Sequence, residues 1–178
     1  MDVLSVICLA SIITAAFSKE CSHPNKTDIN YHWWSCGKGT IEIHDVLVVN
    51  SEGKEEYPFD LTKPIYVISN VTNFGPVYTD MTLSMYLWYL SPSKGCKYRR
   101  IPTLGMMEDL DACQNGVTCP VPHGPQRIKL KLDFTPFRII LSKLKRNAVF
   151  KMRYKVTDRI SGATFCFVVE TQVAKHPQ

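Results

Sequence analysis

The chain has 178 residues, of which 45% are hydrophobic and 21% are charged, and its formal net charge is +5. This length suits one domain with a substantial core, and the sequence shows no repeat, low-complexity tract or interdomain linker. The basic residues lack the clustering with aromatic residues that a nucleic-acid groove requires, so we expect no nucleic-acid partner.

The first 18 residues are predicted to be a secretion signal. Residues 3–17 are apolar and uncharged, yet too short to span a bilayer. Small residues at Ala16 and Ser18 place the cleavage site before Lys19. The charged start of a signal is weak here, because Asp2 is the only charge, and an uncleaved anchor is the alternative. We therefore expect residues 19–178 to form one secreted domain, whose net charge is +6 once Asp2 is lost.

The cysteines also indicate an oxidising compartment. An even number remains after the signal, which predicts three disulfide bonds, although the residues alone do not choose the pairing. These cysteines are Cys21, Cys36, Cys96, Cys113, Cys119 and Cys166. No Cys-x-x-Cys pair occurs and no Cys/His cluster has zinc spacing, so we expect no metal site. Two sequons predict N-glycosylation at Asn25 and Asn70.

Two of these cysteines bracket a tight turn. Cys113 and Cys119 flank a short loop centred on Asn115-Gly116, a dipeptide that tolerates the positive φ angles of such turns. The two thiols are close enough in the chain to bridge, and Pro120 restricts the residues that leave the turn. We expect a stapled hairpin that holds the following strand at a defined angle.

Alternation of apolar and polar residues predicts at least six strands and no convincing helix. A slip in the alternation at Asp45 predicts a bulge in the first strand. One apolar face per strand is typical of antiparallel sheets packed face to face, so we expect an all-β, immunoglobulin-like β-sandwich of two antiparallel sheets. The predicted strands span residues 40–50, 64–73, 79–90, 126–134, 150–156 and 164–174.

Four motifs, in this order, resemble the lipid-recognition family called ML, over residues 33–174. They are Cys36-Gly37 before the first strand, Asn70-Val71-Thr72 at the end of the second, the turn from Cys113 to Pro120, and Phe165-Cys166-Phe167 in the last strand. The resemblance implies a sandwich that encloses an apolar cavity and holds one lipid between its sheets. It also implies the pairs Cys36–Cys166 and Cys113–Cys119, which leaves Cys21 to pair with Cys96. The segment before Cys113 is longer and more basic than in the sterol carriers of the family, so sterol, phospholipid and glycolipid all stay open as ligands.

Catalytic chemistry has little support in the sequence. The histidines lie mostly in turns or tails without an evident partner, and no nucleophile elbow, zinc-protease motif or phosphate-binding glycine loop occurs. We therefore expect no enzyme and no cofactor.

A lipid cavity predicts apolar residues in the connections near its mouth. Residues 91–111 and the connection after residue 134 contain such residues, and so does the end of the third strand. Phe137 in particular is expected to roof the cavity by packing against Leu104 and Trp88. The full set of candidates is Tyr86, Trp88, Leu90, Leu104, Met106, Phe137, Ile139 and Ile140.

Basic residues flank both connections and are expected to contact anionic lipid head groups. They are Arg99, Arg100, Lys143 and Lys145.

The sequence leaves two functions of different classes open. The first is a secreted or lysosomal lipid-binding or transfer protein, monomeric, which touches anionic membranes or a receptor. The alternative is a secreted interaction module, such as a receptor adaptor, with a filled core and no lipid ligand.

Overall fold

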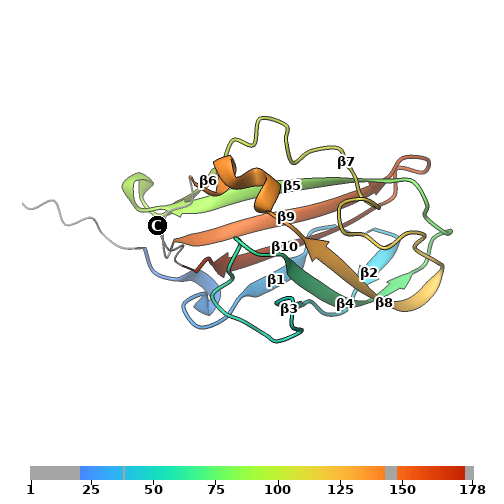
Figure 1. Ribbon diagram of the computed structural model, residues 1–178, viewed down its shortest axis with the longest axis horizontal. Helices are drawn as coiled ribbons and strands as arrows, with labels where there is room; N and C mark the ends of the chain where they lie inside the picture. The colour runs from blue at the N-terminus through green and yellow to red at the C-terminus, as the bar shows by residue number, and fades with distance from the viewer. Residues whose placement is uncertain (1–20, 38, 143–147, 175–178) are drawn as a thin grey trace, which may run out of the picture.

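The structure, a computed structural model, describes residues 21–37, 39–142 and 148–174. The predicted signal at residues 1–18 and the candidates Lys143 and Lys145 lie outside these ranges. Two antiparallel sheets pack face to face, so the predicted β-sandwich is confirmed (Figure 1). No helix within the described ranges is long and apolar enough to cross a membrane.

The larger sheet has six strands. Its main path runs β1-β10-β9-β5-β6, and β7 pairs with the start of β5. The long strands β5, β9 and β10 form its centre, with β1 and β6 at its edges. The bounds are β1 His32–Ser35, β5 Met81–Ser91, β6 Lys97–Arg100, β7 Leu110–Asp111, β9 Val149–Asp158 and β10 Thr164–Gln172.

The smaller sheet is built on β4. One edge of β4 pairs with β8 along its full length, and β2 and β3 pair with different parts of β4. The predicted slip at Asp45 is where the first strand divides into β2 and β3, and the Asp45 carboxylate accepts the backbone N–H of Asn70 at 2.6 Å. The bounds are β2 Ile41–Ile43, β3 Leu47–Val49, β4 Ile65–Asn73 and β8 Gly124–Leu132.

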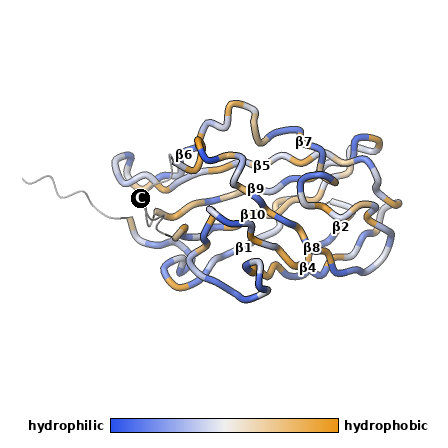
Figure 2. The backbone as a smooth tube through the Cα atoms, viewed as in Figure 1, coloured by the Kyte–Doolittle hydropathy of each residue, from blue (hydrophilic) through white to orange (hydrophobic). Residues whose placement is uncertain are grey.

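The core fills the space between the sheets. Hydrophobic and hydrophilic residues alternate along the strands (Figure 2), and the apolar set of each strand faces the opposite sheet. On β5 these inward residues are the odd-numbered ones, such as Leu83 and Leu87, whereas Tyr86 and Trp88 lie on the outer face. The alternation of side chains along a strand therefore decides which residues can reach the interior.

Three strands were not expected from the sequence, and neither were the short helices. β1 contains Trp33-Trp34 and pairs with β10, although the sequence before Trp33 is polar. β6 and β7 lie in residues 91–111, which was expected to be an irregular connection. The prediction of a hairpin at the disulfide-bonded turn is wrong as well. The turn from Cys113 to Cys119 joins β7 of one sheet to β8 of the other, so these two strands do not pair.

The two ends of the sandwich differ. At the end where β4 leads into β5, called the β4–β5 end, the chain crosses between the sheets at residues 36–40, 74–80 and 112–123. At the opposite end, called the α1 end, the connection from β8 to β9 carries two short helices (Figure 1). The helices are η1 Pro24–Lys26, η2 Pro92–Lys94, η3 Thr135–Phe137 and α1 Arg138–Leu141.

Candidate functional site

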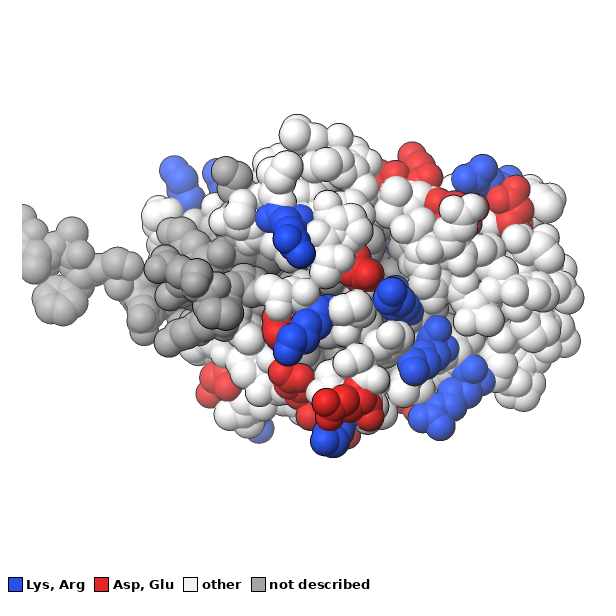
Figure 3. All heavy atoms as spheres, in the orientation of Figure 1, with Lys and Arg blue, Asp and Glu red and all other residues white. Residues whose placement is uncertain are grey.

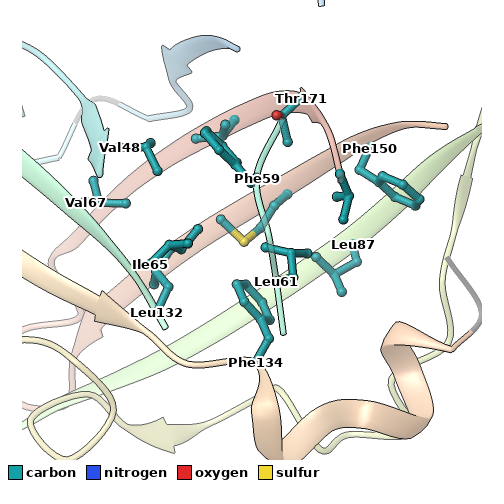
Figure 4. Close-up of a pocket in the computed structure, with 13 residues that line it drawn as sticks. Val48, Phe59, Leu61, Ile65, Val67, Leu87, Leu132, Phe134, Phe150 and Thr171 are labelled. Atoms are coloured by element: carbon teal, nitrogen blue, oxygen red, sulfur yellow. The ribbon is translucent and has the colours of Figure 1, made fainter. Parts of the chain in front are cut away.

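An apolar cavity lies between the two sheets at the α1 end. Side chains from both sheets point toward one another across it, as Val67 and Leu87 do in Figure 4. The atoms exposed to it are all apolar, so the cavity offers no hydrogen bond to an occupant. Its lining consists of Val48, Phe59, Leu61, Ile65, Val67, Leu87, Leu132, Phe134, Phe150, Met152, Val169, Thr171 and Val173.

The lid, residues 57–61, closes one side of this cavity. Its backbone pairs with the end of β10, because Phe59 N–H donates to Gln172 O at 3.3 Å and Ala174 N–H donates to Phe59 O at 2.8 Å. Phe59 and Leu61 are buried and line the cavity. The lid thus supplies apolar lining while its polar backbone groups are satisfied at a sheet edge.

Tyr57 fastens the lid to two other parts of the chain. Its hydroxyl donates to the carbonyl oxygen of Thr27, in the N-terminal segment, and accepts the N–H of Gln172 at 3.0 Å. Burial raises the pKa of Tyr57 above its ordinary value, so the hydroxyl stays protonated and can donate. One side chain therefore links the lid, the N-terminal segment and β10.

The cavity is small in this conformation. Its volume is about 30 Å³, whereas ligand pockets in proteins are usually about 300–1,000 Å³. A lipid can enter only if the sheets or the lid move apart. The physical cost of that movement is the loss of packing around the lining side chains, which a bound apolar ligand would replace.

One polar group lies deeper in the same core. Tyr154 is the next inward side chain of β9 after Met152, it is 0% exposed, and its ring stacks on Phe167 at 5.2 Å. Within the described ranges its hydroxyl has no hydrogen-bond partner. Burial raises the pKa of Tyr154, so the group is neutral, and its neutrality limits the cost of leaving it unpaired.

None of the eight predicted lipid-binding residues lines this cavity. Tyr86 and Trp88 lie on the outer face of the six-stranded sheet, because they occupy the even positions of β5. Leu90 lies on that face too and is buried. The apolar character of this strand end was interpreted as a cavity mouth, but cations cover the aromatic rings instead.

The connections also differ from the expectation. Leu104 is 86% exposed and Ile139 is 74% exposed, so neither packs over the interior, and Met106 is exposed as well. Ile140 is buried in the core. Phe137 is half-buried and lines a separate cleft of about 190 Å³ beside the stapled turn. The prediction that Phe137 packs against Leu104 and Trp88 over the cavity is therefore wrong, since Leu104 is exposed to solvent and Trp88 faces outward.

The predicted head-group residues in the described ranges do not form one patch. Both arginines are exposed on β6, but neighbouring side chains on a strand point to opposite faces. Arg100 lies over the ring of Tyr86 at 5.0 Å and pairs with Glu108 at 2.9 Å. Arg99 points away from that face. Their membrane role stays a prediction.

The disulfide pairs are the ones that the resemblance implied. Cys36 bonds to Cys166, Cys113 to Cys119 and Cys21 to Cys96. Both sequon asparagines are exposed, and their side chains donate to carboxylates at 2.6 Å, Asn25 to Glu170 and Asn70 to Asp45. Glycosylation of either residue stays a prediction.

Sequence reasoning missed the lid. Phe59 and Leu61 stand between Pro58 and Pro64, among polar residues, in a stretch that shows no strand alternation. Two bulky apolar residues at alternate positions in such a stretch are the only available signal. That signal indicates burial, but it does not say against which element.

Comparison with known proteins adds one structural similarity. No family model matches the chain, and no curated protein matches it either. Among solved structures, the chain is similar to a Niemann-Pick type C2 protein from the Japanese carpenter ant. The sequence identity is 11% and the TM-score is 0.48, and the match covers 80% of this chain and 98% of that chain.

Proposed function

We propose that this chain binds a single lipid in the cavity between its two sheets. The observation that carries the proposal is the wholly apolar lining, supplied by both sheets and by the lid. The resemblance of the four motifs to the ML family supports it, and so does the disulfide pattern that the resemblance implied. Sterol, phospholipid and glycolipid each have an apolar body that such a lining could accept.

Binding requires the cavity to grow. Each Å² of apolar ligand surface removed from water contributes roughly 25 cal/mol, less the costs of association and of separating the sheets. The α1 end is the natural place for this separation, because the lid and the helices there are short segments. The buried Tyr154 hydroxyl lies one side-chain layer beyond, so an enlarged cavity would reach a hydrogen-bond donor.

Native mass spectrometry of the secreted protein, followed by organic extraction, tests the proposal. The expected result is a complex of one protein with one lipid. Val67→Phe places a larger side chain in the cavity, and we expect it to reduce binding of a fluorescent fatty acid or sterol by at least about tenfold, since overpacking resists expansion.

Val71→Phe is the matched control. Val67 and Val71 lie on the same face of β4 and are each 1% exposed, but Val71 does not line the cavity. The control should lose a similar amount of stability and keep its lipid binding. Equal loss of binding in both variants would mean that general destabilisation, and not the cavity, sets the affinity.

A second candidate is an interaction module without a lipid. The observation that favours it is the volume of the cavity, which at about 30 Å³ leaves the core nearly filled. Its expected result in the same experiment is a protein with no extractable lipid and no uptake of either probe. The extraction therefore separates the two candidates directly.

The proposal also covers where the protein is located, its oligomeric state and its contact with membranes. Three disulfides and two exposed sequons support a secreted or lysosomal protein, and we propose that residues 1–18 are removed on export. We further propose that it acts as a monomer. Contact with anionic membranes through Arg99, Arg100, Lys143 and Lys145 belongs to the same proposal.

A further inference from the structure

The outer face of the six-stranded sheet carries an unusual set of side chains. Neighbouring strands β6, β5 and β9 place aromatic rings and cations next to one another on this face. The aromatic residues are half-buried, so part of each ring is open to solvent. We call this set the cation–aromatic face, and it consists of Tyr86, Trp88, Tyr98, Arg100, Lys151 and Arg153.

Arg153 occupies the middle of this face. Its guanidinium carbon is 4.6 Å from the ring centre of Tyr86 and 5.6 Å from that of Trp88. Lys151 lies 5.4 Å from Trp88 and 4.0 Å from the ring of Tyr98. Each ring attracts the cation beside it, so the face presents positive charges next to aromatic rings.

Arg100 has a counter-charge, because it pairs with Glu108 at 2.9 Å, and the other two cations of this face differ from it. In the described part of the chain, no carboxylate forms an ion pair with Lys151 or Arg153, and the buried Nε of Arg153 has no hydrogen-bond partner. The carboxylate opposite Lys151 on β10 is that of Glu170, which accepts hydrogen bonds from the Tyr98 hydroxyl and the Asn25 amide. The position opposite Arg153 on β10 is Val168, which carries no charge.

Protection of a sheet edge does not explain these cations. Edge strands often carry exposed lysines that prevent pairing with other chains. β8 fits that explanation, because among the described strands it pairs with β4 alone, and its row of Arg127, Lys129 and Lys131 is exposed (Figure 3). β9, in contrast, is an inner strand with β10 on one side and β5 on the other.

We infer that the cation–aromatic face is a docking surface for a partner protein that presents carboxylate side chains. The guanidinium group suits carboxylates because it offers paired N–H donors in a planar fork. Tyr, Trp and Arg together are typical of the centres of protein interfaces, where carboxylates and apolar groups are contacted at once. The inference does not depend on lipid binding.

A fluorescein-labelled peptide rich in glutamate and tyrosine serves as the probe, with fluorescence anisotropy as the readout. Arg153→Gln should weaken its binding by at least about tenfold, because a hydrogen bond between charged groups is lost. Arg153→Lys keeps the charge but removes the fork, so its binding should also fall several-fold. The melting temperature of each variant reports whether the fold is kept, and Lys151→Gln replaces Arg153→Gln if it is not.

Arg127→Gln is the matched control. It removes one cation from an outer strand face, as Arg153→Gln does, but from the exposed row on β8. Its binding of the peptide should stay within about twofold of the unchanged protein, as expected for a surface charge outside the interface. Equal weakening in both variants would overturn the inference, since it would show attraction by net charge alone. Tighter, Arg153-dependent binding of heparin or of phosphatidylserine vesicles would also overturn it, in favour of a polysaccharide or a membrane.

Discussion

Gly116 shows how one residue fixes the stapled turn against the four-stranded sheet. Its φ angle is 108°, and a Cβ atom there would lie 2.0 Å from the carbonyl oxygen of Lys131. Its own carbonyl accepts the N–H of Lys131 at 3.2 Å. The turn can approach β8 this closely only because the residue has no side chain.

Gly116→Ala is therefore expected to lower the free energy of unfolding by more than about 2 kcal/mol, because it adds backbone strain and a steric clash. Urea denaturation measures this change. Gly105→Ala is the control, since Gly105 also has a positive φ of 79° but no atom within 4 Å of the added carbon. It should cost only about 1 kcal/mol. Similar costs for both variants would show that the contact with Lys131 contributes nothing.

Single residues were predictable where local chemistry decided their position. The Asn115-Gly116 dipeptide predicted a turn, and the turn is there. Tyr86 and Trp88 were not predictable in the same way, because an aromatic ring gains from a dry interior and from a cation on an exposed face alike. Their true neighbours, Arg153 and Lys151, come from a strand more than 60 residues away in the sequence.

At the scale of elements, the lid is the segment whose attachment matters most for entry to the cavity. Tyr57→Phe removes the hydroxyl that links the lid to Thr27 and Gln172. The expected result is a loss of stability of about 1 kcal/mol per hydrogen bond and faster uptake of a fluorescent lipid. Stopped-flow fluorescence measures the rate of uptake.

Tyr31→Phe is a matched control for the lid. The Tyr31 hydroxyl also joins two backbone groups, since it donates to Val46 O at 3.0 Å and accepts from Val48 N at 3.3 Å. Those groups belong to the chain around β3, so the links from the lid to the N-terminal segment and β10 are kept. The rate of uptake should not change in this variant. If Tyr31→Phe speeds uptake as much as Tyr57→Phe does, the lid is not the entrance.

Elements with regular alternation were predicted well. The expected ranges are followed by β4, β5, β8, β9 and β10. In a two-layer sandwich, an apolar residue at every second position indicates a strand with one face packed against the other sheet. β6 and β7 were missed for a physical reason. They are short strands along β5, and in Lys97–Arg100 the cations give no alternation. Their pairing depends on β5 and not on their own sequence.

At the scale of the molecule, the Cys36–Cys166 disulfide closes a loop with a sequence separation of 130 residues, and Cys113–Cys119 closes one of 6. The chain-entropy model assigns the long loop about 5 kcal/mol and the short loop about 2 kcal/mol. Replacing Cys36 and Cys166 by serine should therefore destabilise the protein more than replacing Cys113 and Cys119. Chemical denaturation of both double variants checks the order, and the reverse order would contradict the model.

The placement of the crossings between the sheets has a mechanical consequence. Three of them lie at the β4–β5 end, with the disulfides of Cys36 and Cys113 beside them, so the two sheets are linked most closely at this end. The α1 end lies farthest from these links, so a given rotation of the two sheets relative to each other produces the largest displacement there. The cavity lies at that end. A small rotation of the sheets about the β4–β5 end would thus admit a long apolar chain while the hydrogen bonds between the strands of each sheet stay intact.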